Sequence, residues 1–220
     1  MPRRQNEQVA VRQRCRAAIC TALSLASLSA APAQIIDRVL AVVAGEPITL
    51  SDVNAAIRLG YVALDPGAKE PVQAALTALI EHRLQLIEVN RYVPPEPTPA
   101  QIEARLADVR ARLGSPEALA AALVETGVNE DQLRARIRDV LRIASYHQQR
   151  FGGGAPPAED EIVRYYRSHE ADFVRNGVLR PYNEVRSEAL KRLVQERTAS
   201  LIRDWIDGLR RRADVTVLPR

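Results

Sequence analysis

The sequence predicts a mainly α-helical protein with several helices and a short β-strand near each end. Apolar residues make up 46% of its 220 residues, which is enough for a packed core. Over most of the chain they recur at spacings of three and four, the period of an amphipathic helix. β-Branched residues cluster instead at positions 35–43 and 215–218, a composition typical of strands. We expect these two strands to pair, which would fold the last helix back onto the N-terminal domain.

Residues 1–33 predict a secretory signal peptide. An arginine-rich stretch is followed by an apolar run at residues 17–28 and then by the small-x-small pattern Ala31-Pro32-Ala33. We expect cleavage after Ala33 and export to the periplasm. A signal anchor that stays in the membrane is the alternative, although the apolar run is shorter than the about 18 residues of a usual membrane span.

Removal of this segment would change the charge and the chemistry of the chain. The sequence carries 31 basic and 27 acidic residues, of which five arginines and one glutamate lie in residues 1–33. The remainder therefore has 26 of each and no net charge, which removes the support that a basic chain would give to nucleic-acid binding. Cys15 and Cys20 also lie in the segment, so the remaining chain has no disulfide, thiolate metal site or cysteine nucleophile.

The first elements after this segment are a strand, a turn and a helix. Gly45-Glu46-Pro47 interrupts the first β-branched run and Ile48-Thr49 follows, which predicts a short hairpin. Ser51-Asp52 is expected to open a helix. A longer helix is expected over residues 71–92. One apolar stripe runs along this helix: Leu76, Leu79, Ile80, Leu84 and Ile87.

Capping residues mark the next three helix starts. Thr98, with proline next to it and glutamine three positions on, opens a helix that ends near Gly114. Ser115 opens a short helix that ends at Gly127. Asn129 opens a long helix that runs up to a glycine-rich segment.

The glycine- and proline-rich residues 152–158 predict a linker. It would separate an N-terminal helical domain at residues 34–151 from the C-terminal helices and strand at residues 159–220. Acidic residues begin the next helix at position 159, where negative charge is favourable for the helix dipole. The pattern breaks around Asn176-Gly177, and the last helix is expected over residues 182–212.

No catalytic or metal-binding arrangement emerges from the sequence. The three histidines lie on three different predicted helices: His82, His147 and His169. None has a second histidine one helical turn away, so no metal ligand is expected. Ser145 and Ser168 lie beside histidines but lack the glycines of a nucleophile elbow. The glycines at 152–154 are not followed by lysine and a hydroxyl residue, so they predict neither a phosphate-binding loop nor a cofactor.

Aromatic side chains are the remaining candidates for a binding function. All nine follow residue 33, and Tyr61 and Tyr92 lie at ends of predicted helices, where partial exposure is expected. Tyr165 and Tyr166 belong to a group in the C-terminal third of the chain. Because an exposed aromatic ring beside a groove contacts extended apolar peptide well, these four tyrosines are the predicted peptide-binding residues. Core packing is the alternative role, and it is the role expected for Trp205.

The order of these segments resembles that of the SurA-like periplasmic chaperones. The opening of the mature chains in that family is similar to residues 36–53, IDRVLAVVAGEPITLSDV. Residues 76–88 and 129–145 resemble its next helices, and residues 181–215 resemble the helix and strand that close its chaperone module. The resemblance covers nearly all of residues 34–220 and implies a multi-helix chaperone domain.

One departure from the family bears on activity. Its members usually carry one or two parvulin-type prolyl isomerase domains before the C-terminal helix, whereas here only residues 174–180 lie between the two matching parts. A domain needs about 50 residues or more, so no isomerase residue transfers to this chain and no enzymatic activity is expected.

The resemblance implies an ATP-independent periplasmic chaperone that binds unfolded or extended apolar polypeptide segments, with outer-membrane proteins in transit as candidate clients. From the charge balance, the missing motifs and the short apolar run we expect no nucleic-acid partner, no cofactor and no stable membrane span after cleavage. Two alternatives stay open. One is a peptidyl-prolyl cis-trans isomerase of atypical layout, and the other is a dedicated assembly partner of one envelope protein.

Overall fold

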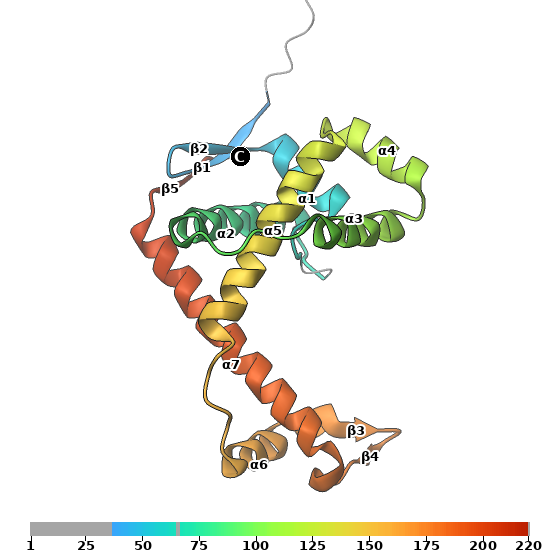
Figure 1. The fold of residues 1–220 in the computed structure, drawn as a ribbon, viewed down its shortest axis with the longest axis vertical. Coiled ribbons are helices and arrows are strands. Elements are labelled where there is room, and N and C mark those ends of the chain that lie inside the picture. The colour runs from blue at the N-terminus through green and yellow to red at the C-terminus, as the bar shows by residue number, and fades with distance from the viewer. Residues whose placement is uncertain (1–36, 65–66, 220) are drawn as a thin grey trace, which may run out of the picture. The chain divides into compact units, whose positions relative to one another are not determined.

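The computed structural model describes residues 37–64 and 67–219. The predicted signal peptide, its cleavage site after Ala33 and both cysteines lie outside the described residues. The described part is mainly α-helical and carries one three-stranded and one two-stranded sheet (Figure 1). This architecture confirms the predicted fold class.

The three-stranded sheet joins segments from near the two ends of the chain. β1 (Val39–Val43) pairs with β2 (Glu46–Thr49) on one side and with β5 (Val215–Val217) on the other, both antiparallel. Ala44 and Gly45 form the β1–β2 turn, and both have positive φ, as a two-residue hairpin requires. The predicted hairpin and the predicted pairing of the two terminal strands are confirmed.

α1 (Leu50–Leu59) begins at Leu50 instead of at Ser51-Asp52, where the sequence predicted its start. Thr49 is the N-cap residue. Its Oγ1 accepts a hydrogen bond from the backbone N–H of Asp52 at 3.2 Å, and the Asp52 carboxylate accepts one from the backbone N–H of Thr49 at 3.1 Å. The predicted start was wrong by one residue. The capping box was not recognised because aspartate takes the place of the usual glutamate or glutamine in it.

The next four helices begin and end close to where the sequence places them. They are α2 (Pro71–Tyr92), α3 (Pro99–Leu113), α4 (Pro116–Thr126) and α5 (Glu130–Phe151). The predicted N-cap side chains accept hydrogen bonds from the backbone N–H three residues on: Thr98, Ser115 and Asn129. Local capping chemistry therefore explains these three helix starts.

The C-terminal part of the chain holds a hairpin that the sequence did not predict. Its elements are α6 (Glu159–Ser168), a 3-10 turn (Glu170–Phe173), β3 (Val174–Arg175), β4 (Val178–Leu179) and α7 (Tyr182–Arg212). Asn176 and Gly177 form the β3–β4 turn with positive φ at both positions. Each strand has two residues, too few for a period of two to be recognised. α7 has the predicted bounds.

Buried apolar side chains form three clusters. The largest unites the three-stranded sheet, α1 to α5 and the end of α7 at Leu209. A second contains Phe173 with residues of α6 and of the first turns of α7. A third joins Val89 of α2 to Ile143 and Tyr146 of α5. α7 also contacts α2 and α5, which confirms that the C-terminal helix packs back onto the N-terminal helices.

Residues 154–158 have no regular structure and connect α5 to α6 at the predicted linker. A division into domains at this segment remains a prediction. Among the described residues, no helix combines the length and the apolar composition needed to cross a membrane.

Candidate functional site

A groove opens between the N-terminal end of α2 and the three-stranded sheet. Its volume is about 370 Å³. Three of its apolar side chains are partly exposed: Val72 (43%), Val217 (53%) and Leu218 (38%). We call it the β5 groove, and its apolar lining includes Leu40, Leu50, Val72, Leu76, Val217 and Leu218. Pro71 and the polar side chains of Arg38, Glu70 and Gln73 complete the lining, which carries one positive and one negative charge.

β5 reaches this groove at its C-terminal end, through Val217 and the following Leu218. The backbone N–H of Ala44 donates to the carbonyl oxygen of Asp214, and that of Leu218 donates to the carbonyl oxygen of Leu40, both at 2.9 Å. In an antiparallel pair the residues that bond to the partner alternate with residues whose N–H and C=O point away from it. The backbone groups of Val215 and Val217 therefore point to the outer edge, and no other described strand pairs with β5 there.

A cluster of aromatic rings lies where α2, α5 and α7 meet. The ring centroid of Tyr146 is 5.6 Å from that of Tyr92 and 5.4 Å from that of Trp205. Trp205 also lies 5.5 Å from His147 and 5.7 Å from Phe151. We call these five residues the aromatic cluster. Trp205 packs at the edge of the core, in line with the expected core-packing role, and contacts two of the three apolar clusters.

Tyr92 is the exposed member of the aromatic cluster, at 58%. Its exposure confirms that part of the prediction. The next residue, Val93, ends α2 in the left-handed region with φ 43° and is 74% exposed. A valine costs energy in this conformation, and Pro94 after it prevents the helix from continuing. The end of α2 thus presents two neighbouring apolar side chains to solvent.

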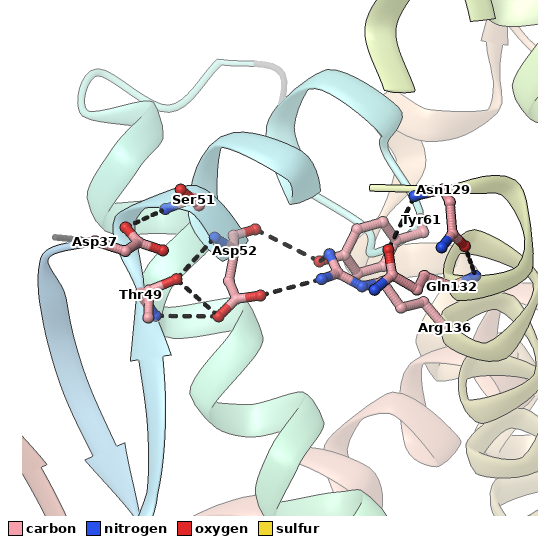
Figure 2. A network of polar contacts seen from close by, with 8 residues as sticks. All are labelled: Asp37, Thr49, Ser51, Asp52, Tyr61, Asn129, Gln132 and Arg136. Carbon is pink, nitrogen blue, oxygen red and sulfur yellow. Dashed lines mark hydrogen bonds and ion pairs between the residues drawn. The ribbon is translucent and has the colours of Figure 1, made fainter. Parts of the chain in front are cut away.

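Tyr61 is buried, so the expectation that it is partly exposed was wrong. Figure 2 shows the polar network that holds it. Arg136 of α5 donates to the Tyr61 hydroxyl at 2.9 Å and to the Asp52 carboxylate at 3.1 Å. The Arg136 guanidinium lies 5.1 Å from the centre of the Tyr61 ring. Because the hydroxyl has a charged partner inside the fold, the ring can be buried, and it cannot contact a peptide from solvent.

A small pocket of about 150 Å³ adjoins this network. Two arginines and two aspartates line it together with Tyr61 and His82: Arg83, Arg136, Asp52 and Asp139. Burial, together with the positive charges of the nearby Arg83 and Arg136, lowers the pKa of His82 to about 4. Burial also raises the pKa of the Asp139 carboxyl. The two positive and two negative charges balance, and the volume would admit only a few water molecules, so the pocket fits a structural role.

Tyr165 and Tyr166 belong to the second apolar cluster and are half-buried. The Tyr166 hydroxyl donates to the carbonyl oxygen of Arg180 at 2.7 Å, and its ring lies 5.3 Å from that of Phe173. The Tyr165 ring stacks on His169 at 4.1 Å. These contacts tie α6 to the segment that precedes α7.

The four predicted tyrosines therefore lie in three different surroundings and do not form one site. Whether Tyr92, Tyr165 and Tyr166 contact a peptide stays a prediction.

The sequence did not predict the β5 groove, because its lining comes from positions near 40, 72 and 217 that only the sheet brings together. The one feature of the sequence that pointed toward this groove was the β-branched C-terminal strand.

The described residues contain no group of three or more potential metal ligands, and His82, His147 and His169 lie on separate elements.

Comparison with known proteins finds similarity among solved structures. No family model and no curated protein matches the chain. Among solved structures it is similar to a chain from Campylobacter jejuni, described with the virulence factor PEB4 and the periplasmic protein Cj1289 as structurally related SurA-like chaperones. The TM-score is 0.53 at 14% sequence identity, over 84% of this chain and 100% of the other. At this identity the similarity establishes a SurA-like fold.

Proposed function

We propose that this protein is an ATP-independent chaperone of the periplasm that binds unfolded or extended apolar segments of other polypeptides, outer-membrane proteins among them. The observation that carries the proposal is the β5 groove, a solvent-open and mainly apolar cavity beside a strand edge with which no other described strand pairs. It occurs on a fold shared with proteins described as SurA-like chaperones, one of them periplasmic. The signal-like residues 1–33 support export.

The size of the groove fits weak and reversible binding. Burial of an apolar side chain contributes on the order of 1–3 kcal/mol before the costs of association are subtracted. Val72, Val217 and Leu218 offer three such partly exposed contacts. A client held by so few contacts dissociates quickly, so its release needs no nucleotide.

The first experiment is an aggregation assay with the full chain. A urea-denatured porin is diluted into buffer, and light scattering is followed with and without an equimolar amount of the protein. Clear suppression in the absence of nucleotide is expected. Unchanged scattering, from protein that circular dichroism shows to be folded and helical, would refute the proposal.

A matched pair of variants tests whether the groove is responsible. Val72→Asp places a charge in the groove, at the first turn of α2, where a carboxylate also favours the helix. Val124→Asp places the same charge on an exposed residue of α4 outside the groove. We expect Val72→Asp to lose suppression and Val124→Asp to keep it.

The two alternative functions give different results. A prolyl isomerase would accelerate cis-trans exchange in a proline peptide above the uncatalysed rate. A dedicated assembly partner would leave porin aggregation unchanged and would capture one folded protein in fixed stoichiometry.

A further inference from the structure

We propose that the client segment binds as a fourth strand, antiparallel to β5, and inserts alternate apolar side chains into the β5 groove. This inference rests on the proposed function and specifies the binding mode. Three features of the described residues lead to it: the unpaired backbone groups of β5, the face on which the groove lies, and the charge of its lining.

The edge requires a partner with free backbone groups. Val215 and Val217 each direct one N–H and one C=O away from β1, and two residues of a strand span about 7 Å. A helix cannot satisfy these groups, because its own N–H and C=O groups are bonded internally. An extended segment can form up to about four hydrogen bonds with them.

The groove selects the side chains of that segment. Val217 lines the groove, and it pairs with Ala41, which is fully buried on the core face of the sheet. In an antiparallel pair, residues directly opposite each other point to the same face. The client residue opposite Val217 therefore points its side chain toward the groove, whereas its neighbours point, like Thr216, to the exposed face. The fitting partner is a strand with apolar and polar residues in alternation.

The charge of the lining favours a neutral segment. Arg38 and Glu70 supply opposite charges to the groove, so no net charge on the client is called for. Arg38 also donates to the carbonyl oxygen of Pro219, two residues after the strand, at 3.3 Å. A three-residue edge with a proline two residues beyond its end is too short for extensive edge-to-edge pairing, and this favours transient clients over stable assembly with a second copy.

The test uses a fluorescein-labelled ten-residue peptide with valine and serine in alternation, and fluorescence anisotropy with the full chain. Val217→Pro removes one outward N–H but keeps an apolar ring, and proline is tolerated on an outer strand edge. Val217→Leu keeps both the N–H and the apolar contact. We expect Val217→Pro to weaken binding about 3- to 10-fold and Val217→Leu to leave it within about twofold.

Modified peptides test the register from the client side. In the antiparallel arrangement, the valines supply both the groove contacts and the N–H groups that face β5. N-methylation of the valines should therefore abolish binding, and N-methylation of the serines should leave it unchanged. Equal binding of all three peptides, or loss only with methylated serines, would overturn the proposal.

The other outcomes distinguish a failure of the proposed function from a failure of the strand-addition binding mode. If the unmodified peptide and the denatured porin both fail to bind, the proposed function fails and this inference with it. If both bind but Val217→Pro binds as the parent does, only the strand-addition mode is wrong. If Val217→Pro converts a dimer to a monomer without changing peptide affinity, the edge pairs with a second copy and the inference is again overturned.

Discussion

Lowering the pH from 7 to 5 is expected to destabilise the protein through His82. This side chain lies in the pocket between α1, α2 and α5, where burial and, to a smaller extent, the charges of Arg83 and Arg136 lower its pKa from 6.5 to about 4. Below pH 6.5 the unfolded chain binds a proton at this histidine, whereas the folded chain does not until the pH approaches 4. The stabilisation is therefore fully present above pH 6.5 and is lost as the pH falls.

The magnitude follows from the two pKa values. Between pH 6.5 and 4 the difference of one bound proton lowers the free energy of unfolding by about 1.4 kcal/mol per pH unit. From pH 7 to pH 5 the loss amounts to about 2 kcal/mol. This is a large part of the stability of an ordinary domain.

The assay compares urea unfolding of the parent protein and of His82→Gln, followed by circular dichroism at pH 7 and pH 5. Glutamine is polar and of similar size but does not titrate. Burial also lowers the pKa of His147, and because His147 is present in both proteins its contribution cancels in the comparison. We expect the parent to lose about 2 kcal/mol more than His82→Gln. Equal losses in the two proteins would refute the assignment to His82.

Three further predictions concern the fold and can be checked by the same unfolding measurements. Tyr61→Phe leaves the Nη1 of Arg136 without its hydroxyl partner and should cost about 1–2 kcal/mol, with peptide affinity unchanged because the ring is buried. Asn129→Ala removes the acceptor of the Gln132 backbone N–H, 2.8 Å away, and should cost about 1 kcal/mol. Trp205→Leu removes ring contacts with the aromatic cluster and should cost about 2 kcal/mol. An unchanged midpoint in any of these variants would contradict the role assigned to that side chain.

The sequence by itself determined most of the helices of this protein. The starts at Thr98 and Asn129 depend on one side chain and a backbone N–H three residues away, and such contacts are readable from spacing alone. The bounds of α2 and α7 follow from apolar periodicity that ends at prolines or at a change of composition. The start of α1 was displaced because the aspartate of its capping box was not recognised, which is still a local matter.

Burial and the binding surface were decided by the tertiary structure. Tyr61 is buried because Arg136, 75 residues further along the chain, supplies a partner for its hydroxyl. The β5 groove exists because the pairing of β1 with β5 places Val217 near Val72. Clusters of β-branched residues predicted both strands, but they could not indicate which edge of the sheet stays open. Exposure and cavities depend on contacts between distant segments, and these contacts leave no pattern within any one segment of the sequence.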